Sequence, residues 1–201
     1  MILNGTASEL YETLRGRFPG APTPPMPGAQ MLPYQMVALY GLARPWDHRD
    51  MRILEIGTGH GTSTYMLSKA APAAEIVSLS LNKHEAIPAH QALRRAQCGN
   101  VYVLVSRSDR YRLAYPDVLW DMIFVDGDHK HIGADMPWWN QVRPGGLFLC
   151  HDYSARTCPP VYETLNAFRA QLGRPFDVEI VDGDGTGMAG WYRGAGETWS
   201  E

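Results

Sequence analysis

The chain has 201 residues, the length of one domain with room for a small addition. Hydrophobic residues make up 45% of it and charged residues 19%, a composition that argues against intrinsic disorder. The formal net charge of −3 lacks the strongly basic character of a nucleic-acid-binding domain, so we expect no nucleic-acid partner.

The three cysteines, Cys98, Cys150 and Cys158, form no C-x-x-C motif and cannot all pair with one another. Free thiols suit a reducing compartment. The N-terminus has no cationic segment followed by an apolar one, and no apolar run reaches the roughly 20 residues that a membrane span needs. We therefore expect a cytoplasmic protein that is not associated with a membrane.

The N-terminal part is expected to hold two helices and a cover segment. Leu10 and Leu14 lie at helical spacing, and Ser8 is the expected N-cap, in a start without a capping box. Five prolines within residues 19–28 exclude regular structure there. A second helix is expected at about residues 30–43.

From residue 52 onward, short apolar runs alternate with helical patterns. Strands are expected at residues 53–56, 76–79, 101–105, 122–125 and 147–150. Helices are expected at about residues 62–71, 84–97, 131–142 and 159–172. This alternation predicts βαβ units and a parallel sheet covered on both faces. Two last apolar runs, 176–181 and 188–192, flank a D-G turn at residues 182–185, which predicts a closing antiparallel hairpin.

Adjacent tryptophans, Trp138 and Trp139, lie in the helix expected before the fifth strand of this core. Neighbouring residues of a helix point in different directions. We therefore expect one of them to pack on the sheet and the other to face outward.

A glycine-rich loop, E-I-G-T-G-H-G at residues 55–61, follows the first core strand. Glycines allow a tight turn and the close approach of a ligand, and the next helix offers unpaired N–H groups. The spacing is neither the G-x-G-x-x-G of dinucleotide sites nor that of a P-loop. The acidic Glu55 suits a cationic ligand better than a phosphate, and a plain tight turn is the alternative interpretation.

Two carboxylates, Asp126 and Asp152, end neighbouring expected strands. Adjacent parallel strands are about 4.8 Å apart, so these side chains can converge on one hard cation such as Mg²⁺. The alternative is that both only cap the helices that follow. Asp128 and His129 lie on the same loop as Asp126, and either can serve as a general base; His129 has the more suitable ordinary pKa, about 6.5.

Two other metal interpretations are weak. The histidines and cysteines between residues 129 and 158 lack the usual spacing of zinc ligands. The segment that begins at Asp182 resembles a calcium loop, but Arg193 stands at its twelfth position, where such a loop needs glutamate.

Three motifs together resemble a known family. E-x-G-x-G-x-G at residues 55–61, D-M-I-F-V-D-G-D-H at 121–129 and P-G-G-L-F-L-C-H-D-Y at 144–153 are similar to motifs of class I S-adenosylmethionine-dependent methyltransferases. The resemblance is to their small-molecule O-methyltransferase branch, methyltransferase family 24, and covers about residues 50–193. It implies an α/β, Rossmann-like fold with a seven-stranded, mostly parallel sheet and a C-terminal antiparallel hairpin. The expected division is an N-terminal segment, residues 1–50, and a methyltransferase core domain, residues 51–201.

The resemblance also implies the position of the cofactor, S-adenosylmethionine. The residues expected to bind it are Glu55, Gly57, Thr58, Gly59, Gly61, Thr62, Ser80, Ser108, Asp109 and Asp126. Ser80 departs from the family pattern because it stands where an acidic residue usually holds the ribose hydroxyls. Arg107 likewise replaces an acid near the adenine. Asn82 and Glu85 are candidates to compensate for the missing acid at Ser80.

We therefore predict an S-adenosylmethionine-dependent O-methyltransferase that acts on a small hydroxylated molecule. Asp126 and Asp152 are the expected Mg²⁺ ligands, His129 is the expected general base, and Asp128 is the second candidate base. Exposed aromatic residues and the N-terminal helices suggest a homodimer. The alternative is a catalytically silent binding protein that kept this fold, which the residues at positions 80 and 107 motivate. A nicotinamide-dependent oxidoreductase is disfavoured by the glycine spacing.

Overall fold

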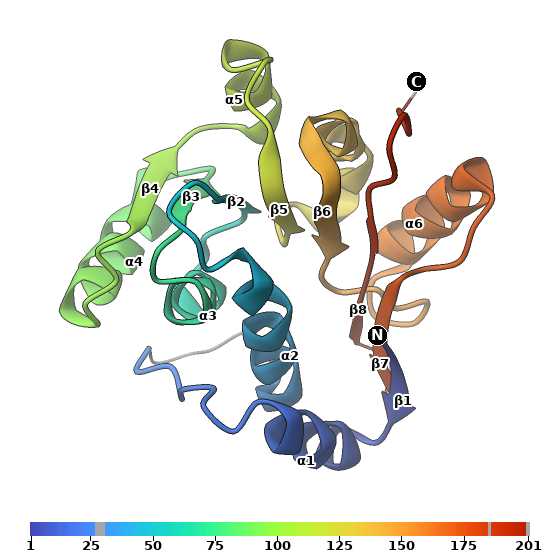
Figure 1. Cartoon of the computed structure of the whole chain (residues 1–201), viewed down its shortest axis with the longest axis horizontal. Coiled ribbons are helices and arrows are strands. Elements are labelled where there is room, and N and C mark those ends of the chain that lie inside the picture. The colour runs from blue at the N-terminus through green and yellow to red at the C-terminus, as the bar shows by residue number, and fades with distance from the viewer. Residues whose placement is uncertain (27–30, 185, 200–201) are drawn as a thin grey trace.

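The computed structural model describes residues 1–26, 31–184 and 186–199 and contains one eight-stranded sheet with helices on both faces (Figure 1). Pro27 and Gly28 of the proline-rich stretch and Gly185 of the predicted turn lie outside the described residues. The strands are β1 (Ile2–Gly5), β2 (Arg52–Ile56), β3 (Glu75–Ser80), β4 (Val101–Val105), β5 (Trp120–Val125), β6 (Val142–Cys150), β7 (Val178–Asp182) and β8 (Gly187–Tyr192). The α-helices are α1 (Ala7–Arg17), α2 (Pro33–Ala43), α3 (Thr62–Ala70), α4 (Lys83–Arg95), α5 (Ser108–Ala114) and α6 (Pro159–Leu172). The 3₁₀ helices are η1 (Arg44–Trp46), η2 (His129–Ala134) and η3 (Met136–Gln141).

The strand order is β1-β7-β8-β6-β5-β2-β3-β4. β8 runs antiparallel to both of its neighbours, and the other described pairs are parallel. The predicted α/β class, mostly parallel sheet and closing hairpin are confirmed. The expected count of seven strands is wrong, because β1 adds an eighth at the edge, where Ile2 pairs with Glu179 of β7. This strand has four residues, too short for its apolar pattern to separate it from the helix that follows.

The start of α1 also differs from the prediction. Thr6, and not Ser8, is the N-cap. Its hydroxyl accepts a hydrogen bond from the Glu9 backbone N–H, while the Glu9 carboxylate accepts one from the Thr6 backbone N–H. This reciprocal pair is a capping box, which starts the helix two residues earlier than the pattern of apolar side chains indicated.

The core lies in two layers, one on each face of the sheet. Side chains of α1, α2, α3 and α4 pack on one face, and those of η2, η3 and α6 on the other. Because both faces are covered, β5 is buried along its whole length. Trp138 and Trp139 are both fully buried in the second layer, so the expected outward-facing tryptophan is wrong. They lie in a 3₁₀ helix, where Tyr111 of α5 stacks on Trp138 and Phe168 of α6 packs on Trp139.

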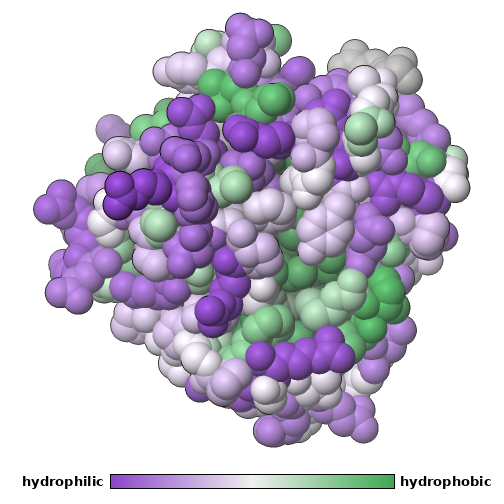
Figure 2. All heavy atoms as spheres, in the orientation of Figure 1, coloured by the Kyte–Doolittle hydropathy of each residue, from purple (hydrophilic) through white to green (hydrophobic). Residues whose placement is uncertain are grey.

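The surface is largely hydrophilic on the face shown in Figure 2, with hydrophobic residues over α5 at the top and in a larger area at the lower right, near α2 and β1. Leu113 of α5 is 70% exposed and Tyr115 is 51% exposed. In the described part of the chain, none of the helices has the length and apolar character required to cross a bilayer. Cys98, Cys150 and Cys158 are free cysteines.

Candidate active site

A cavity of about 890 Å³ opens where the parallel strands end. Its wall is formed by the segments that follow β2, β3, β4, β5 and β6, because parallel strands present their carboxyl ends at the same edge of a sheet. Of the residues predicted to bind the cofactor, those that line the cavity are Gly57, Thr58, Gly59, Ser80, Ser108, Asp109 and Asp126. Glu55, Gly61 and Thr62 are not among the residues that line it.

The glycine loop approaches the neighbouring β5 loop more closely than a side chain would allow. Gly57 has φ +105°, and a Cβ placed on it would lie 2.0 Å from the carbonyl oxygen of Asp126. Gly59 and Gly61 also have positive φ values, of +48° and +84°. Gly61 is the N-cap of α3 and offers no side chain to the first N–H groups of that helix. The N–H groups of Gly57 and Thr58 donate to the carbonyl of Leu79, and that of Gly61 donates to the carbonyl of Thr58, so the glycines form a tight turn in the cavity wall.

Glu55 anchors the loop from behind. Its side chain is fully buried, and its carboxylate accepts hydrogen bonds from the hydroxyls of Thr64 and Ser78. Burial raises the pKa of Glu55 to about 7, although hydroxyls, including that of Ser63, pull it the other way. Glu55 therefore holds α3 and β3 to the end of β2, and it reaches the cavity only through the loop that it supports.

The segment after β3 carries Ser80, which stands at the position of the expected acid, and Asn82 and Glu85, the two candidates to compensate for it. The Ser80 hydroxyl donates a hydrogen bond to the carbonyl of Asn82 (3.1 Å). Asn82 Oδ1 in turn caps α4 by accepting from the Glu85 backbone N–H (3.0 Å). Both side chains are thus engaged locally. The exposed carboxylate of Glu85 lines the same cavity and remains as the acidic group on this side.

The segment after β4 forms α5, which the sequence pattern did not indicate. Arg107 donates two hydrogen bonds to Asp109 (3.0 and 2.8 Å), so this exposed pair neutralises itself. The Ser108 hydroxyl donates to the carboxylate of Asp135. Burial raises the pKa of Asp135 to about 6, against the effect of Ser108. Asp135 lines the cavity but was not among the predicted residues, because it lies between two 3₁₀ helices and belongs to no recognisable motif.

A cluster of two carboxylates and two imidazoles forms another part of the cavity wall. Nε2 of His129 lies 2.9 Å from Oδ2 of Asp152 and 3.6 Å from Oδ1 of Asp126. Nδ1 of His151 lies 3.0 Å from the same Asp126 oxygen and 3.3 Å from the same Asp152 oxygen. The structure therefore brings Asp126, His129 and Asp152 together, as the strand ends predicted. It adds His151, which is buried and which sequence reasoning assigned no role.

The four groups perturb one another strongly. The neighbouring carboxylates of Asp126 and Asp152 raise the pKa of His129 to about 10. Burial would lower the pKa of His151, but the same carboxylates raise it to about 10. Burial would likewise raise the pKa values of Asp126 and Asp152, but the two imidazoles lower both. In the absence of another cation, both imidazoles therefore carry a positive charge at neutral pH.

Asp128 is separate from this cluster. Its carboxylate lies 2.8 Å from Nδ1 of His131, and it caps η2 by accepting from the Lys130 backbone N–H. Both Asp128 and His131 are exposed, although they line the same cavity. Of the two predicted candidate bases, the structure thus places His129, and not Asp128, against Asp126 and Asp152.

Asp152 occupies an unusual backbone conformation. Its φ is +54°, and among the described non-glycine residues it shares a positive φ only with Gln97. Aspartate tolerates this left-handed region better than most residues, at a cost of order 1–3 kcal/mol. At Asp152 this conformation occurs in a residue whose carboxylate contacts both imidazoles of the cluster.

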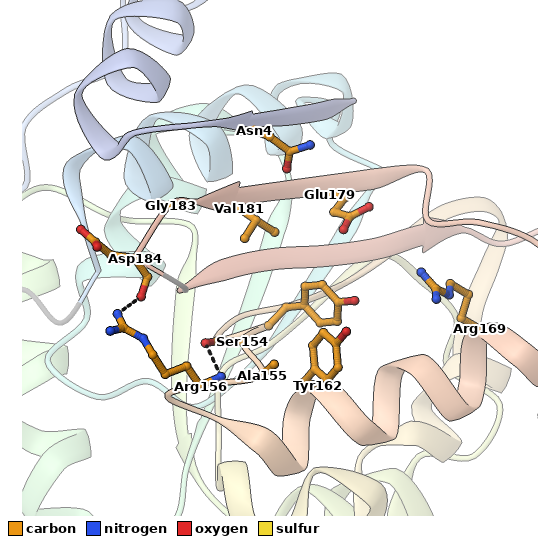
Figure 3. A pocket seen from close by; sticks show the side chains of 11 residues that line it. Asn4, Ser154, Ala155, Arg156, Tyr162, Arg169, Glu179, Val181, Gly183 and Asp184 are labelled. Carbon is orange, nitrogen blue, oxygen red and sulfur yellow. Dashed lines mark hydrogen bonds between the residues drawn. The ribbon is translucent and has the colours of Figure 1, made fainter.

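A second cavity, of about 480 Å³, shares no residue with the first. Figure 3 shows it between the strand edge, which contributes Asn4 and Glu179, and α6, which contributes Tyr162 and Arg169. Tyr153 stacks on Tyr162 with ring centroids 5.0 Å apart. None of the residues predicted for catalysis or binding lies in this second cavity.

The sheet order and the ligand-binding edge define a class I methyltransferase architecture, and the comparisons agree. The O-methyltransferase of Bacillus cereus, solved in complex with S-adenosylhomocysteine, has a TM-score of 0.67 and 21% identity, covering 90% of this chain and 89% of that one. The O-methyltransferase TomG of Streptomyces achromogenes, solved with S-adenosylmethionine, has a TM-score of 0.67 and 25% identity, covering 94% and 89%. The S-adenosylhomocysteine-bound methyltransferase PaMTH1 of Podospora anserina has a TM-score of 0.62 and 22% identity, covering 97% and 88%.

The family model of methyltransferase family 24, a methyltransferase domain, matches residues 54–153, about half of the chain. No curated protein matches the chain in sequence. The chain belongs to this methyltransferase family, as its motifs predicted. It is an S-adenosylmethionine-dependent methyltransferase.

Proposed function

We propose that this enzyme transfers the methyl group of S-adenosylmethionine to a hydroxyl group of a small molecule, with the help of a divalent cation. The observation that carries the proposal is the cluster of Asp126, Asp152 and His129 in the wall of the cavity that the glycine loop also lines. Groups suited to activate a hydroxyl and a loop suited to hold the cofactor therefore face one space.

The residues of the cluster fit a divalent cation. Asp126 and Asp152 supply the carboxylate oxygens that such ions prefer, and both lie within the same group of candidate ligands. Nε2 of His129 is buried and makes no hydrogen bond of acceptable geometry, although Asp152 Oδ2 is only 2.9 Å away. Asp126 and Asp152 are the residues proposed to hold the ion, and Mg²⁺ is the ion that the sequence predicted. When bound, such an ion acts as a Lewis acid that lowers the pKa of the acceptor hydroxyl.

The residues of this chain supply the remaining steps. The loop that contains Gly57 and Gly59 binds and orients the cofactor through its backbone, and Glu85 accepts hydrogen bonds from the ribose hydroxyls in place of the family's usual acid. The acceptor oxygen attacks the methyl carbon, a C–O bond forms, the C–S bond breaks, and the electron pair stays on sulfur. His129 takes the hydroxyl proton. It performs this step in its unprotonated form, whose fraction grows as the pH rises.

The acceptor is proposed to be a small molecule because the cavity is bounded by loops of one chain. TomG, one of the similar structures, is an enzyme of tomaymycin synthesis, which supports a small acceptor here. We also propose a cytoplasmic location, which the free cysteines support.

The test is a transfer assay with methyl-labelled S-adenosylmethionine and a panel of hydroxylated small molecules, run with EDTA and after metal is added back. We expect transfer to at least one acceptor, loss of transfer in EDTA, and recovery with a divalent cation. Full activity in EDTA would remove the cation from the mechanism. Tight binding of S-adenosylhomocysteine without transfer to any hydroxyl acceptor would overturn the proposed reaction.

A further inference from the structure

Gln35, in helix α2 of the N-terminal segment, reaches across the fold to the cluster of carboxylates and imidazoles. Its side-chain oxygen, Oε1, lies 3.1 Å from Nε2 of His151, although 116 positions separate the two residues. Gln35 is 1% exposed and His151 is 5% exposed. The contact is therefore shielded from water, and its polar atoms form their hydrogen bonds with neighbouring protein groups.

The orientation of the Gln35 amide is fixed by two further contacts. Oε1 also accepts a hydrogen bond from the backbone N–H of Leu32 (2.8 Å), while the amide nitrogen donates to the hydroxyl of Tyr34 (3.4 Å). A backbone N–H can only donate, so the atom that faces it is the oxygen and not the nitrogen. That oxygen can only accept, and Nε2 of His151 must therefore carry a hydrogen.

The other ring nitrogen, Nδ1, is consequently the one that His151 presents to the carboxylates. It lies 3.0 Å from Oδ1 of Asp126 and 3.3 Å from Oδ2 of Asp152. Ligand atoms at right angles around an ion bound at about 2.1 Å are about 3.0 Å apart, which is 2.1 Å multiplied by the square root of two. The spacing of Nδ1 from both oxygens thus matches that of neighbouring ligands around one ion.

The chemistry of the second ring nitrogen supports the same conclusion. A histidine that binds a metal through one nitrogen usually donates its other N–H to a carboxylate or carbonyl oxygen, which fixes the tautomer and the direction of the ring. Gln35 supplies that oxygen here. In addition, the sulfur of Cys158 lies within 4.8 Å of ligand atoms of His129 and Asp152, so the donor atoms near the site are not only oxygens.

We propose that His151 is a third protein ligand of the divalent cation, through Nδ1, and that Gln35 is the residue that positions it. The resulting set of two carboxylates and one imidazole favours a transition-metal ion such as Mn²⁺ or Co²⁺ over Mg²⁺, because imidazole is a poor ligand for Mg²⁺. This inference rests on the cation site of the proposed function and refines the identity of the ion given there.

The first test measures metal binding directly, on the full-length, metal-stripped protein, by titration with Mn²⁺ and with Mg²⁺. We expect Mn²⁺ to bind at least tenfold more tightly. Gln35→Leu removes the acceptor and should weaken Mn²⁺ binding by about 10–100-fold, the usual effect of losing such a partner. Gln35→Glu keeps an acceptor oxygen and should restore binding. His131→Gln removes a histidine of the same cavity that lies outside the cluster, and it should leave the Mn²⁺ affinity unchanged.

The second test identifies the ligand. Pulsed electron paramagnetic resonance of the Mn²⁺-loaded wild type should show coupling to a ¹⁴N nucleus. His151→Asp should abolish this coupling and reduce the preference for Mn²⁺ over Mg²⁺. Absence of nitrogen coupling in the wild type, its persistence in His151→Asp, or wild-type Mn²⁺ affinity in Gln35→Leu would each overturn the proposal. The wild-type spectrum and the Gln35 variants decide the matter even where His151→Asp does not fold.

These readouts are separate from the transfer assay. A protein that methylates a hydroxyl in a cation-dependent manner but binds Mg²⁺ as tightly as Mn²⁺ would keep the proposed function and refute this inference. A protein that shows nitrogen-coupled Mn²⁺ but full transfer in EDTA would support this inference and refute the role of the cation in the proposed function.

Discussion

Replacing Glu55 by glutamine tests whether burial raises the pKa of the carboxyl group that lies behind the glycine loop. Burial raises the pKa of Glu55 from 4.5 to about 7 in the folded protein. The unfolded chain ionises near 4.5, so between these two values the folded state binds the proton and the unfolded state does not. The stability of the wild type should therefore fall as the pH rises from 4.5 to 7 and level off above that range.

The size of the effect follows from the shift. Two and a half units, at 1.36 kcal/mol each, correspond to about 3 kcal/mol. Glutamine cannot ionise, so the Glu55→Gln variant should lack this loss. It also loses part of the hydrogen bonding with Thr64 and Ser78, which adds an offset that does not depend on pH. The quantity to examine is therefore the difference in the free energy of unfolding between variant and wild type, and how this difference changes with pH.

The assay is urea unfolding, followed by tryptophan fluorescence, at several pH values between 4.5 and 8. The free energy of unfolding of Glu55→Gln, relative to the wild type, should rise by about 3 kcal/mol across this range. The exposed Glu12→Gln controls for the loss of one negative charge. A difference that stays constant with pH would show that Glu55 ionises normally in the folded state and would refute the reasoning.

Four further predictions concern the active site and the assembly. His129→Ala should lower turnover by about 10²–10⁴-fold with S-adenosylhomocysteine affinity unchanged. Wild-type turnover should also rise with pH as the His129 imidazole loses its proton, a dependence that the variant should lose. Asp152→Asn should weaken the cation and raise the acceptor KM more than the cofactor Kd, and equal changes in both would contradict the assignment. Gly59→Val, at a φ of +48°, should reduce S-adenosylhomocysteine affinity in calorimetry, and wild-type affinity would show that the cofactor does not approach this loop. A homodimer, whose interface of standard size buries about 1,200–2,000 Å², should appear in sedimentation at micromolar concentration, and monomer alone would exclude it.

Much of the fold could be predicted because its signals are local. The apolar runs of the core act within a few residues and formed the predicted strands, and the last two runs formed the predicted antiparallel hairpin. The carboxylates of Asp126 and Asp152 could be paired from sequence because parallel strands bring their ends together. The strand β1 was missed because four residues carry too little pattern, and its place at the sheet edge depends on β7, far away in the chain.

The unpredicted parts of the site depend on contacts between distant segments. Gln35 contacts His151 because α2 packs beside the sheet, and no motif in the N-terminal segment predicts this contact. The pKa of His129 could not be predicted from the residue alone, because two carboxylates on different strands set it. Asp135 became a buried acid through its position between two 3₁₀ helices. The roles of such residues depend on the folded structure and cannot be predicted from the local sequence.

The close contact between Gly57 and the carbonyl of Asp126 has a mechanical consequence. The backbone N–H of Asp126 also donates to the carbonyl of Ile56 (2.8 Å), so main-chain atoms of the segments that end β2 and β5 are in direct contact. Main-chain contacts have no rotamers and cannot adjust as side chains do. In the proposed function, the loop after β2 holds the methyl donor and the loop after β5 faces the acceptor hydroxyl. The separation between donor and acceptor is then a property of the scaffold. Exchanging side chains around the cavity should change which acceptor binds and how tightly, while leaving the length of the methyl group's path almost fixed.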